Sequence, residues 1–409
     1  MSIKSVGMAH FRKRHAQPLL DQLLQYSPLV GVFGHRQCGK TTFVSHSQKH
    51  YVSLDDEDSL REAMESAKAF VLAHGGRRAV IDECQLAPPL FPALKEWVRD
   101  HPKPGQFILT GSVRFSSRKA IRESLTGRLV SLELYPMVLS ELLERELPDS
   151  LPLLLQATHF DHSCSTTLKK PSRHEQVAWE KYLIQGGLPR LAFTRDDRNR
   201  QDLLESLLRL IVDRDLRMVV ETRLSPETLF KLLRYIAAQA WEPYKYADAR
   251  RVTGLSEVTQ KKLLYGLESI FLVRRISIEG QTGDTFLLED QLEENTLTRG
   301  AQTSERKITG ALYRNLRAQL GYRSGKSFEC FSYRLRSGAW VPLVFRSGGR
   351  ELGLIVYAGD EPTLGQRRSA SRFLRDFPHG KIVFVSAHAK GAEVLEDRVL
   401  SCAAASLVI

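Results

Sequence analysis

The chain has 409 residues, of which 42% are hydrophobic and 26% are charged, and its formal net charge is +12. Since single hydrophobic cores rarely grow beyond about 250–300 residues, this length predicts two or three domains. The sequence contains no apolar run long enough to span a bilayer, and residues 1–17 are polar and basic, without the apolar stretch of a secretory signal. We therefore expect a cytoplasmic protein that makes no membrane contact.

The cysteine content and the charge leave two broad questions open. The five cysteines are scattered and form no CxxC pair, which is typical of reduced thiols rather than of a disulfide framework or a zinc finger. Residues 159–164 contain two histidines and a cysteine, but without a second ligand pair we expect a polar surface loop there. The positive charge favours contact with polyanions such as DNA. A protein that is merely basic explains it equally well, because the arginines are spread over the whole chain.

The first 145 residues alternate short apolar strands with helices. We expect strands at residues 29–33, 51–54, 79–81, 107–109 and 129–134. A helix should begin near Lys40, another should be capped by Asp58 or Ser59 and run to about Leu72, and a third should lie between the third and fourth strands. This alternation predicts a parallel sheet that is covered by helices on both faces.

The rest of the chain divides into a linker and two further units. Residues 146–175 are rich in Pro, Ser and Thr and predict a linker. Residues 176–285 have apolar residues at helical spacing. Within this unit we expect helices at 226–240, 246–252 and 256–269. After Glu289 the polar sequence predicts a loop to about Thr303. Residues 300–409 predict a mixed unit with helices at 308–320 and 364–377 and strands at 328–333, 341–345, 352–357 and 382–385.

Residues Gly34 to Thr41 match the pattern GxxxxGK[ST] at every fixed position, between an apolar strand and a predicted helix. Glycines allow such a loop to turn its N–H groups toward phosphates, and the helix directs its positive end at the same anion. Lys40 adds a full charge and the Thr41 hydroxyl completes a Mg²⁺ shell. The predicted nucleotide-binding residues are Gly34, His35, Arg36, Gln37, Cys38, Gly39, Lys40, Thr41 and Thr42.

A second part of the site is predicted at the end of the third strand, where Asp82 and Glu83 follow an apolar run. Asp82 would hold Mg²⁺ together with Thr41, mostly through water. Glu83 would act as the general base that polarises the attacking water. Two adjacent carboxylates are often a solvated turn, but their position next to a complete P-loop favours the catalytic role.

Two further catalytic candidates come from neighbouring strands. Thr110, with Ser112 as second choice, ends the strand beside the Asp82 strand and is expected to orient water or contact the γ-phosphate. An ordinary strand-to-loop turn is the alternative. Arg128 follows Thr126 and Gly127 and could reach the γ-phosphate of a neighbouring subunit as an arginine finger. Most arginines in such places are simply surface residues.

These motifs, in this order, resemble the prokaryotic AAA-superfamily ATPases in which a P-loop domain precedes a C-terminal region of unknown function. The segments that carry the resemblance are Gly34–Thr42, Ser53–Asp55, Ile81–Gln85, Leu109–Ser112, Leu125–Arg128, Leu134–Pro136 and Glu141. Tyr182–Pro189 resembles the GG-x-P turn of the C-terminal region, and Val212–Asp215 resembles its next helix. The resemblance implies ATP binding and hydrolysis with Mg²⁺.

In that family a winged-helix module usually follows, and residues 226–276 fit it. In its third helix Gln260, Lys261 and Lys262 are expected to point outward, where they could contact DNA. A winged helix that serves only as a structural or protein-contact module is the alternative.

The family's C-terminal end often resembles a restriction endonuclease, whose chemistry needs an Asp, a Glu and a Lys on adjacent strands. Here Pro342, Ile355 and Tyr357 stand at the equivalent positions. None of the three can bind a metal or activate water, so the resemblance implies the fold without cleavage. Asp360 and Glu361 are expected to form a turn.

The sequence as a whole predicts an α/β protein: a P-loop NTPase domain with a parallel sheet, a helical and winged-helix domain, and an endonuclease-like α/β domain. We expect ATP hydrolysis with Mg²⁺ to change the posture of the later domains. The alternative is a nucleotide-gated DNA-binding switch with little turnover, whose DNA binding would depend on Lys261 and Lys262. A homo-oligomer is possible, and the sequence leaves the oligomeric state open.

Overall fold

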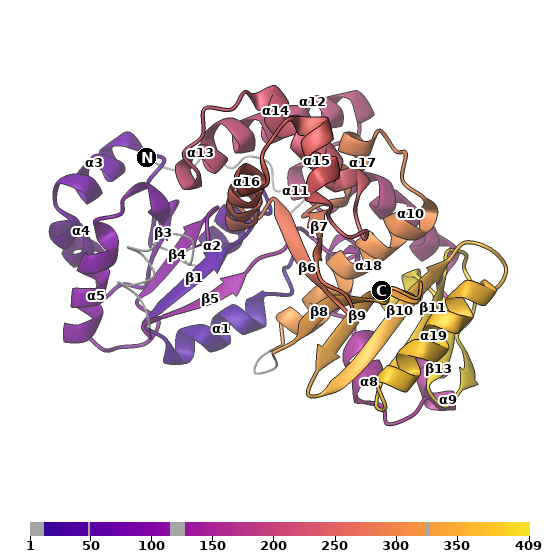
Figure 1. Ribbon diagram of the computed structural model, residues 1–409. Helices are drawn as coiled ribbons and strands as arrows, with labels where there is room; N and C mark the ends of the chain where they lie inside the picture. Colours follow the sequence, from indigo (N-terminus) through magenta and orange to yellow (C-terminus); the bar gives the residue numbers. More distant parts are fainter. Residues whose placement is uncertain (1–11, 48–49, 115–126, 324–326) are drawn as a thin grey trace.

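The computed structural model describes residues 12–47, 50–114, 127–323 and 327–409. Figure 1 shows a parallel sheet at one end of the molecule, a second sheet of orange and yellow strands at the other, and a group of helices above and between them. The first sheet has the order β2-β3-β4-β1-β5, and all its pairings are parallel. Its strands are β1 Leu29–Phe33, β2 His50–Ser53, β3 Ala79–Asp82, β4 Phe107–Gly111 and β5 Leu129–Glu133. The predicted parallel sheet is confirmed.

Helices cover both faces of this sheet, as the alternation of the sequence indicates. Val30 and Ile108 belong to one hydrophobic core, whereas Ile81 and Leu109 belong to another, because successive side chains of a strand point to opposite faces. The helices are α1 Gln17–Tyr26, α2 Lys40–Ser47, α3 Glu57–Glu65, α4 Ala67–His74 and α5 Leu90–Asp100, with a 3₁₀ turn at Cys84–Leu86.

The second predicted helix differs from its expected form. It is broken at Ser66 into α3 and α4, and its N-cap is Asp56 rather than Asp58 or Ser59. The Asp56 carboxylate accepts a hydrogen bond from the Ser59 N–H at 3.0 Å, which satisfies one of the free donors of the first turn.

A largely helical region follows and contains the three helices that we expected between residues 226 and 269. Its elements are α10 Arg173–Gln185, α11 Pro189–Ala192, α12 Asp197–Leu210, a π-helical turn at Ile211–Asp215, α13 Leu216–Val219, α14 Pro226–Ala238, α15 Tyr246–Thr253 and α16 Glu257–Ser269. Each of the last three begins within about two residues of its predicted start, a normal margin for helix ends.

The second sheet has eight strands in the order β12-β13-β11-β10-β9-β8-β6-β7. They are β6 Val273–Glu279, β7 Asp284–Leu288, β8 Glu329–Arg334, β9 Trp340–Ser347, β10 Arg350–Tyr357, β11 Lys381–Ser386, β12 Glu393–Glu396 and β13 Val399–Ala403, with helix α19 Leu364–Asp376. The hairpin β6–β7 comes directly after α16, and β6 pairs in parallel with β8. The hairpin at the wing position of the predicted winged helix is therefore an edge of the C-terminal sheet.

The prediction of a linker at residues 146–175 is wrong. The short helix α7 Leu139–Leu142 is followed by α8 Ser150–Gln156 and α9 His162–Thr167, which lie beside the yellow strands in Figure 1. Leu151, Leu154 and Leu155 are buried in the core of the C-terminal sheet. The buried ammonium of Lys381 donates to the Leu155 carbonyl at 3.1 Å. The segment is thus an integral layer of the C-terminal unit.

The prediction of a loop from Glu289 to about Thr303 is also wrong. This segment contains helix α17 Gln291–Thr298, which leads to α18 Ser304–Gly321. Its polar side chains are buried and paired: Glu289 with Arg317, Glu294 with Arg314, and Asp290 with the Gly187 N–H at 2.7 Å. Polarity did not indicate exposure here, because each charge has a partner from another part of the chain.

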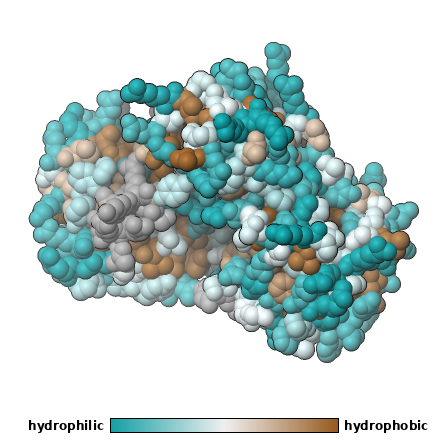
Figure 2. Space-filling view, viewed as in Figure 1, coloured by the Kyte–Doolittle hydropathy of each residue, from teal (hydrophilic) through white to brown (hydrophobic). Residues whose placement is uncertain are grey.

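The surface is mostly hydrophilic on the face drawn in Figure 2, with scattered hydrophobic residues. None of the helices within the described ranges is both long and apolar enough to cross a membrane.

Candidate nucleotide-binding site

Strand β1 ends at Phe33 and helix α2 begins at Lys40, so the glycine-rich residues form the turn between them. Gly39 has φ +99°, a conformation that side chains strongly disfavour. Gly34 is needed for a different reason: a Cβ atom there would lie 2.2 Å from the carbonyl oxygen of Leu134. Both glycines of the motif are therefore required by the local geometry. Thr42 follows on the first turn of α2.

Lys40 lies across this loop. Its ammonium donates to the carbonyl oxygens of Gly34 at 3.1 Å and His35 at 3.0 Å, and the residue is only 5% exposed. These two hydrogen bonds hold the loop in a closed turn around the Lys40 ammonium. A turn of this kind, with a cation inside it, suits the binding of a phosphate group.

Asp82 at the end of β3 is the centre of a hydrogen-bond cluster. Its Oδ2 accepts from the Thr41 hydroxyl at 2.7 Å and from the Tyr51 hydroxyl at 2.5 Å. Its Oδ1 accepts from the Glu83 N–H at 3.1 Å and from the Thr110 hydroxyl. The structure thus brings Thr41 and Asp82 together, and both present hard oxygen atoms of the kind that Mg²⁺ prefers.

Tyr51 is a partner of Asp82 that we did not predict from the sequence. It lies on β2, which pairs with β3, and its hydroxyl reaches Asp82 over the end of the sheet. Burial, together with the hydrogen bond to Asp82, raises the pKa of this tyrosine above its ordinary value. Tyr51 therefore remains a proton donor to the carboxylate. Only the strand register could have indicated it.

Glu83 has a left-handed backbone conformation, with φ 54°. The Gln85 amide donates a hydrogen bond to its carboxylate. Burial raises the pKa of Glu83, and the Lys40 charge and the Gln85 amide only partly offset this. A carboxylate with a raised pKa is a stronger base than an ordinary one, so the environment suits the role expected from the sequence.

Thr110 is placed differently from our expectation. Ile81 pairs with Leu109, so Asp82 and Thr110 are the next residues along two adjacent strands. The threonine is fully buried and its hydroxyl is directed at Asp82. It therefore positions the carboxylate instead of facing water. Ser112 is also buried, just beyond the strand.

Arg128 does not join the site of its own chain. The next residue, Leu129, pairs with Leu29 at the start of β1, whereas the phosphate loop follows the end of β1. Arg128 therefore lies at the opposite end of the strands from the phosphate loop, and as an arginine finger it could act only on another subunit. Thr126 of the same motif lies outside the described residues.

Besides the contact of Thr41 with Asp82, three side-chain links among the described residues tie the loop to other parts of the chain. The first is the buried Arg14, which donates to the carbonyl oxygens of Cys38 at 2.9 Å and Tyr135 at 2.6 Å and pairs with Glu141 at 3.1 Å. Because Arg14 donates to the backbone carbonyl of Cys38, it holds the loop backbone at that residue independently of the loop side chains. The Cys38 thiol is buried as well, which raises its pKa.

The second link is a buried pair between the loop and α17. His35 Nε2 lies 3.0 Å from Glu293 Oε1, and neither side chain is exposed. His35 Nδ1 lies 2.6 Å from the Arg36 carbonyl oxygen, to which it donates. Burial lowers the pKa of His35, but the Glu293 carboxylate and the hydrogen bonds outweigh it and leave the pKa raised. This pair therefore favours a protonated imidazole.

The third link joins Arg36 to the π-helical turn. Arg36 Nη1 lies 3.1 and 3.2 Å from the two carboxylate oxygens of Asp215. Burial raises the pKa of Asp215, and Arg36 partly offsets the rise. Gln37, the next loop residue, has φ 61°.

The predicted DNA-contact residues need correction. Gln260 is fully buried: its side chain accepts from the Tyr244 hydroxyl at 2.9 Å and donates to the carbonyl of Leu255 at 2.9 Å. It is a core residue of the helical unit and cannot face DNA. Lys261 and Lys262 are exposed, but Lys261 pairs with Glu257 at 2.7 Å and Lys262 donates to the Glu221 carbonyl at 2.9 Å.

The three residues that we predicted to stand in place of an endonuclease's metal ligands and lysine lie in the second sheet. Pro342 is on β9, Ile355 is buried on β10, and the Tyr357 hydroxyl is 3.1 Å from Ser401 Oγ. Glu361 pairs with Arg367 at 2.7 Å and Asp360 precedes it in a turn. Within the described ranges, no group of three or more His, Cys, Asp or Glu residues is arranged to hold a metal ion.

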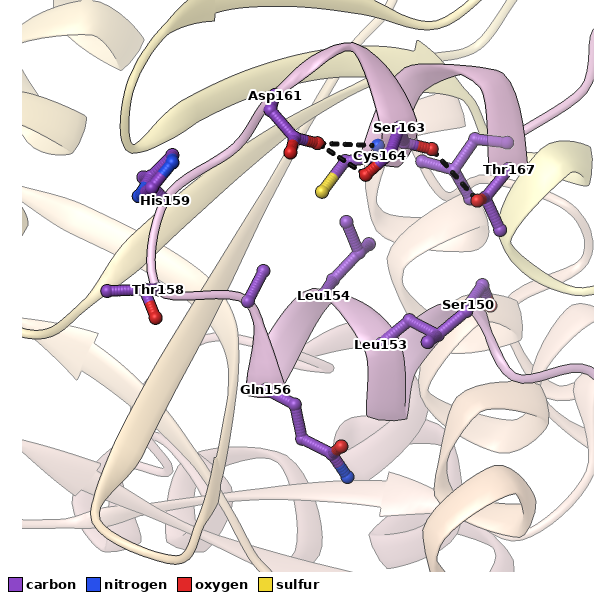
Figure 3. Close-up of a pocket in the computed structure, with 12 residues that line it drawn as sticks. Ser150, Leu153, Leu154, Gln156, Thr158, His159, Asp161, Ser163, Cys164 and Thr167 are labelled. Atoms are coloured by element: carbon purple, nitrogen blue, oxygen red, sulfur yellow. Dashed lines mark hydrogen bonds between the residues drawn. The ribbon is translucent and has the colours of Figure 1, made fainter.

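A separate hollow of about 390 Å³ lies between α8 and α9. Figure 3 shows Asp161 turned toward α9, where it caps the helix through the Cys164 N–H at 3.1 Å. The lining includes His159 and Cys164 but no residue of the phosphate loop. The expected surface loop at residues 159–164 is therefore partly helical, and it borders a hollow remote from the candidate site.

Comparison with known proteins gives two family matches. A family described as an AAA domain matches residues 26–143, and a family described as a domain of unknown function matches residues 176–278. The first match begins at the last residue of α1 and ends after α7, so it covers the whole parallel sheet and the phosphate loop.

Two relatives and two solved structures are similar to parts of the chain. The relatives are uncharacterized proteins of Mycobacterium bovis and Mycobacterium tuberculosis, each 23% identical over 268 residues, which is 65% of this chain. The chain covers 53%, or about half, of the length of these relatives. A Walker-type ATPase of Pyrococcus abyssi aligns with a TM-score of 0.43 at 13% identity, over 69% of this chain and 94% of that one. A Vibrio cholerae protein aligns with a TM-score of 0.17 at 10% identity, over 88% of this chain and 89% of that one.

The match to an AAA domain and the five-stranded parallel sheet point to the same part of the chain, and the phosphate loop lies within it. Together they support a P-loop ATPase domain of the AAA type in residues 26–143.

Proposed function

We propose that this chain binds ATP together with Mg²⁺ at residues 34–42 and hydrolyses it. One observation carries the proposal: the Thr41 hydroxyl donates to Asp82 at 2.7 Å, which joins the phosphate loop to the acidic end of the neighbouring part of the sheet. Lys40 directly precedes Thr41 in the sequence, and Glu83 directly follows Asp82. A P-loop that served only as a turn would not need this set of four.

The phosphates are bound by the loop and by the start of α2. Lys40 supplies a charge to the β- and γ-phosphate oxygens, and the N-terminus of α2 adds its dipole. Thr41 and Asp82 fit Mg²⁺, because a hydroxyl and a carboxylate lie within one hydrogen bond of each other. The ion would neutralise charge on the phosphates when bound.

Glu83 is the proposed general base. Its pKa is raised by burial, and the Gln85 amide holds its carboxylate in one orientation. Glu83 takes up the proton of the attacking water as the bond from the water oxygen to the γ-phosphorus forms. The bond from this phosphorus to the oxygen that bridges the β- and γ-phosphates breaks, and ADP leaves with that oxygen. Thr110 and Tyr51 hold Asp82 in position through its two oxygens. We further propose that the cycle of binding and hydrolysis changes the posture of the helical and C-terminal parts.

Steady-state hydrolysis by four variants tests this assignment. Lys40→Ala is expected to lose both nucleotide binding and turnover. Glu83→Gln is expected to bind ATP but to lower kcat by about 10²–10⁴-fold, the usual contribution of a general base. Lys95→Ala and Glu62→Gln change exposed residues of the same domain and should behave as wild type. Turnover by Glu83→Gln at the wild-type rate would exclude Glu83 as the base.

A further inference from the structure

The link between Arg36 and Asp215 has features that a purely structural ion pair does not need. Asp215 is the last residue of the π-helical turn Ile211–Asp215, and it is only 2% exposed. π-Helical turns are rare, and they interrupt the regular hydrogen bonding of a helix most often at functional sites. Here the irregular turn places one buried carboxylate against the third residue of the phosphate loop.

The pair borders the proposed position of the phosphates. Burial raises the pKa of Asp215, and both Arg36 and Lys40 oppose this rise. Burial likewise raises the pKa of Glu83, and Lys40 and Arg36 are among the groups that oppose it. Arg36 and Lys40 therefore act electrostatically on both carboxylates, Asp215 and Glu83.

Of these three links to the phosphate loop, this one has the most exposed cation. Arg14 is bound to backbone carbonyls, and the side chains of His35 and Glu293 are completely buried. The Arg36 side chain keeps 18% of its surface exposed. It can therefore turn from Asp215 toward an incoming anion without opening the core.

Resting on the proposed function, we propose that Arg36 is a further phosphate ligand and that Asp215 competes with ATP for it. While its guanidinium is paired with Asp215, Arg36 holds the π-helical turn against the phosphate loop. When ATP binds, its phosphates carry more negative charge than one carboxylate and draw Arg36 away. Asp215 is thus a positioning residue whose release reports that the site is filled.

The release has a structural path into the helical unit. Helix α13 Leu216–Val219 follows the π-helical turn without a break. It packs on α16 at Gly266, where an added Cβ atom would lie 2.3 Å from Val220 and 2.8 Å from Leu216. Because this contact leaves no free space, a shift of the turn is passed to α16. In Figure 1, α13 and α16 lie between the parallel sheet and the other helices.

Equilibrium binding of a fluorescent ATP analogue with Mg²⁺ to the full chain tests the competition. Asp215→Asn removes the competitor, so it is expected to tighten binding by about 5- to 30-fold, a usual range for coupled sites. Asp213→Asn is the matched control: this exposed acid is in the same turn, 4.0 Å from Arg217. It should stay within about twofold of wild type, as surface charges usually do. Asp215→Glu should restore wild-type affinity.

Repeating the measurement in the Arg36→Ala variant distinguishes competition for Arg36 from simple repulsion between Asp215 and the phosphates. Arg36→Ala should weaken binding, and Asp215→Asn added to it should give no further tightening. If Asp215→Asn tightens binding equally with and without Arg36, repulsion alone explains the effect and the inference is overturned. It is also overturned if Asp215→Asn binds no more tightly than Asp213→Asn.

Hydrogen exchange gives an independent readout that does not depend on the affinity of any Asp215 variant. In the wild-type chain, ATP should speed exchange at residues 211–219, and in Arg36→Ala these amides should be fast before ATP is added. If the wild-type chain binds ATP but exchange at residues 211–219 does not change, the inference is overturned and the proposed function is not. A wild-type chain that binds no ATP would overturn the proposed function, and the inference with it.

Discussion

Removing one hydroxyl tests whether Asp82 is held in place by its neighbours. Thr110→Val keeps the shape of a fully buried side chain but deletes the donor that faces Asp82. Hydrogen bonds to charged groups contribute roughly 1.5–3 kcal/mol, and the unpaired carboxylate oxygen adds to the loss. We therefore expect the free energy of unfolding to fall by about 2–3 kcal/mol. Tyr51→Phe, which removes a half-buried donor to the other oxygen, should cost less.

The assay is urea denaturation of both variants, with and without MgATP. Bound Mg²⁺ also contacts the Asp82 carboxylate in our account, so saturating MgATP should reduce the deficit of Thr110→Val. A ligand that binds only the folded state stabilises each protein by an amount set by its affinity. The deficit therefore shrinks because Mg²⁺ compensates the unpaired carboxylate oxygen and Thr110→Val binds MgATP more tightly than wild type. An unfolding free energy of Thr110→Val within about 0.5 kcal/mol of wild type, the range of neutral surface changes, would refute the reasoning.

Three other substitutions test separate parts of the structure. The pKa of His35 is raised in the folded chain. The pair of His35 with Glu293 therefore contributes its full stability at pH values below the ordinary histidine pKa of about 6.5. This contribution is lost as the pH rises through the pKa of His35 in the folded chain. Glu293→Gln should accordingly cost most stability at low pH, with a thermal deficit that shrinks toward alkaline pH; a deficit that grows instead would exclude a charged imidazole. Gly34→Ala forces a Cβ atom against the Leu134 carbonyl and should abolish nucleotide binding, which a filter-binding assay would detect. Gln260→Ala leaves buried groups unpaired and should lower the unfolding free energy by about 1–3 kcal/mol; a fully stable variant would contradict its place in the core.

The elements that the sequence predicted best are those that local pattern determines. The strand at 29–33 and the glycine at 39 are specified by residues close in the chain, because buried parallel strands are continuously apolar and the loop needs a left-handed φ at Gly39. The same holds for α14 and α16, whose apolar spacing and serine caps are visible without any tertiary information.

The failures involve polar residues whose partners are distant in sequence. Glu289 pairs with Arg317 and Gln260 with Tyr244, and no local pattern distinguishes such a buried group from a solvated one. Tyr51 was missed for a similar reason, because its role depends on β2 lying beside β3. The linker at 146–175 was misread since its turn-forming residues separate two short helices instead of joining two domains.

Calorimetric titration of the full chain with MgATP tests the central claim most directly. The account predicts one site per chain for wild type and for Lys95→Ala, and none for Lys40→Ala. The ammonium of Lys40 lies buried inside the phosphate loop, so its loss removes the main charge of that site. Absence of any heat of binding by folded wild-type protein at millimolar MgATP, or equal binding by Lys40→Ala, would contradict the account.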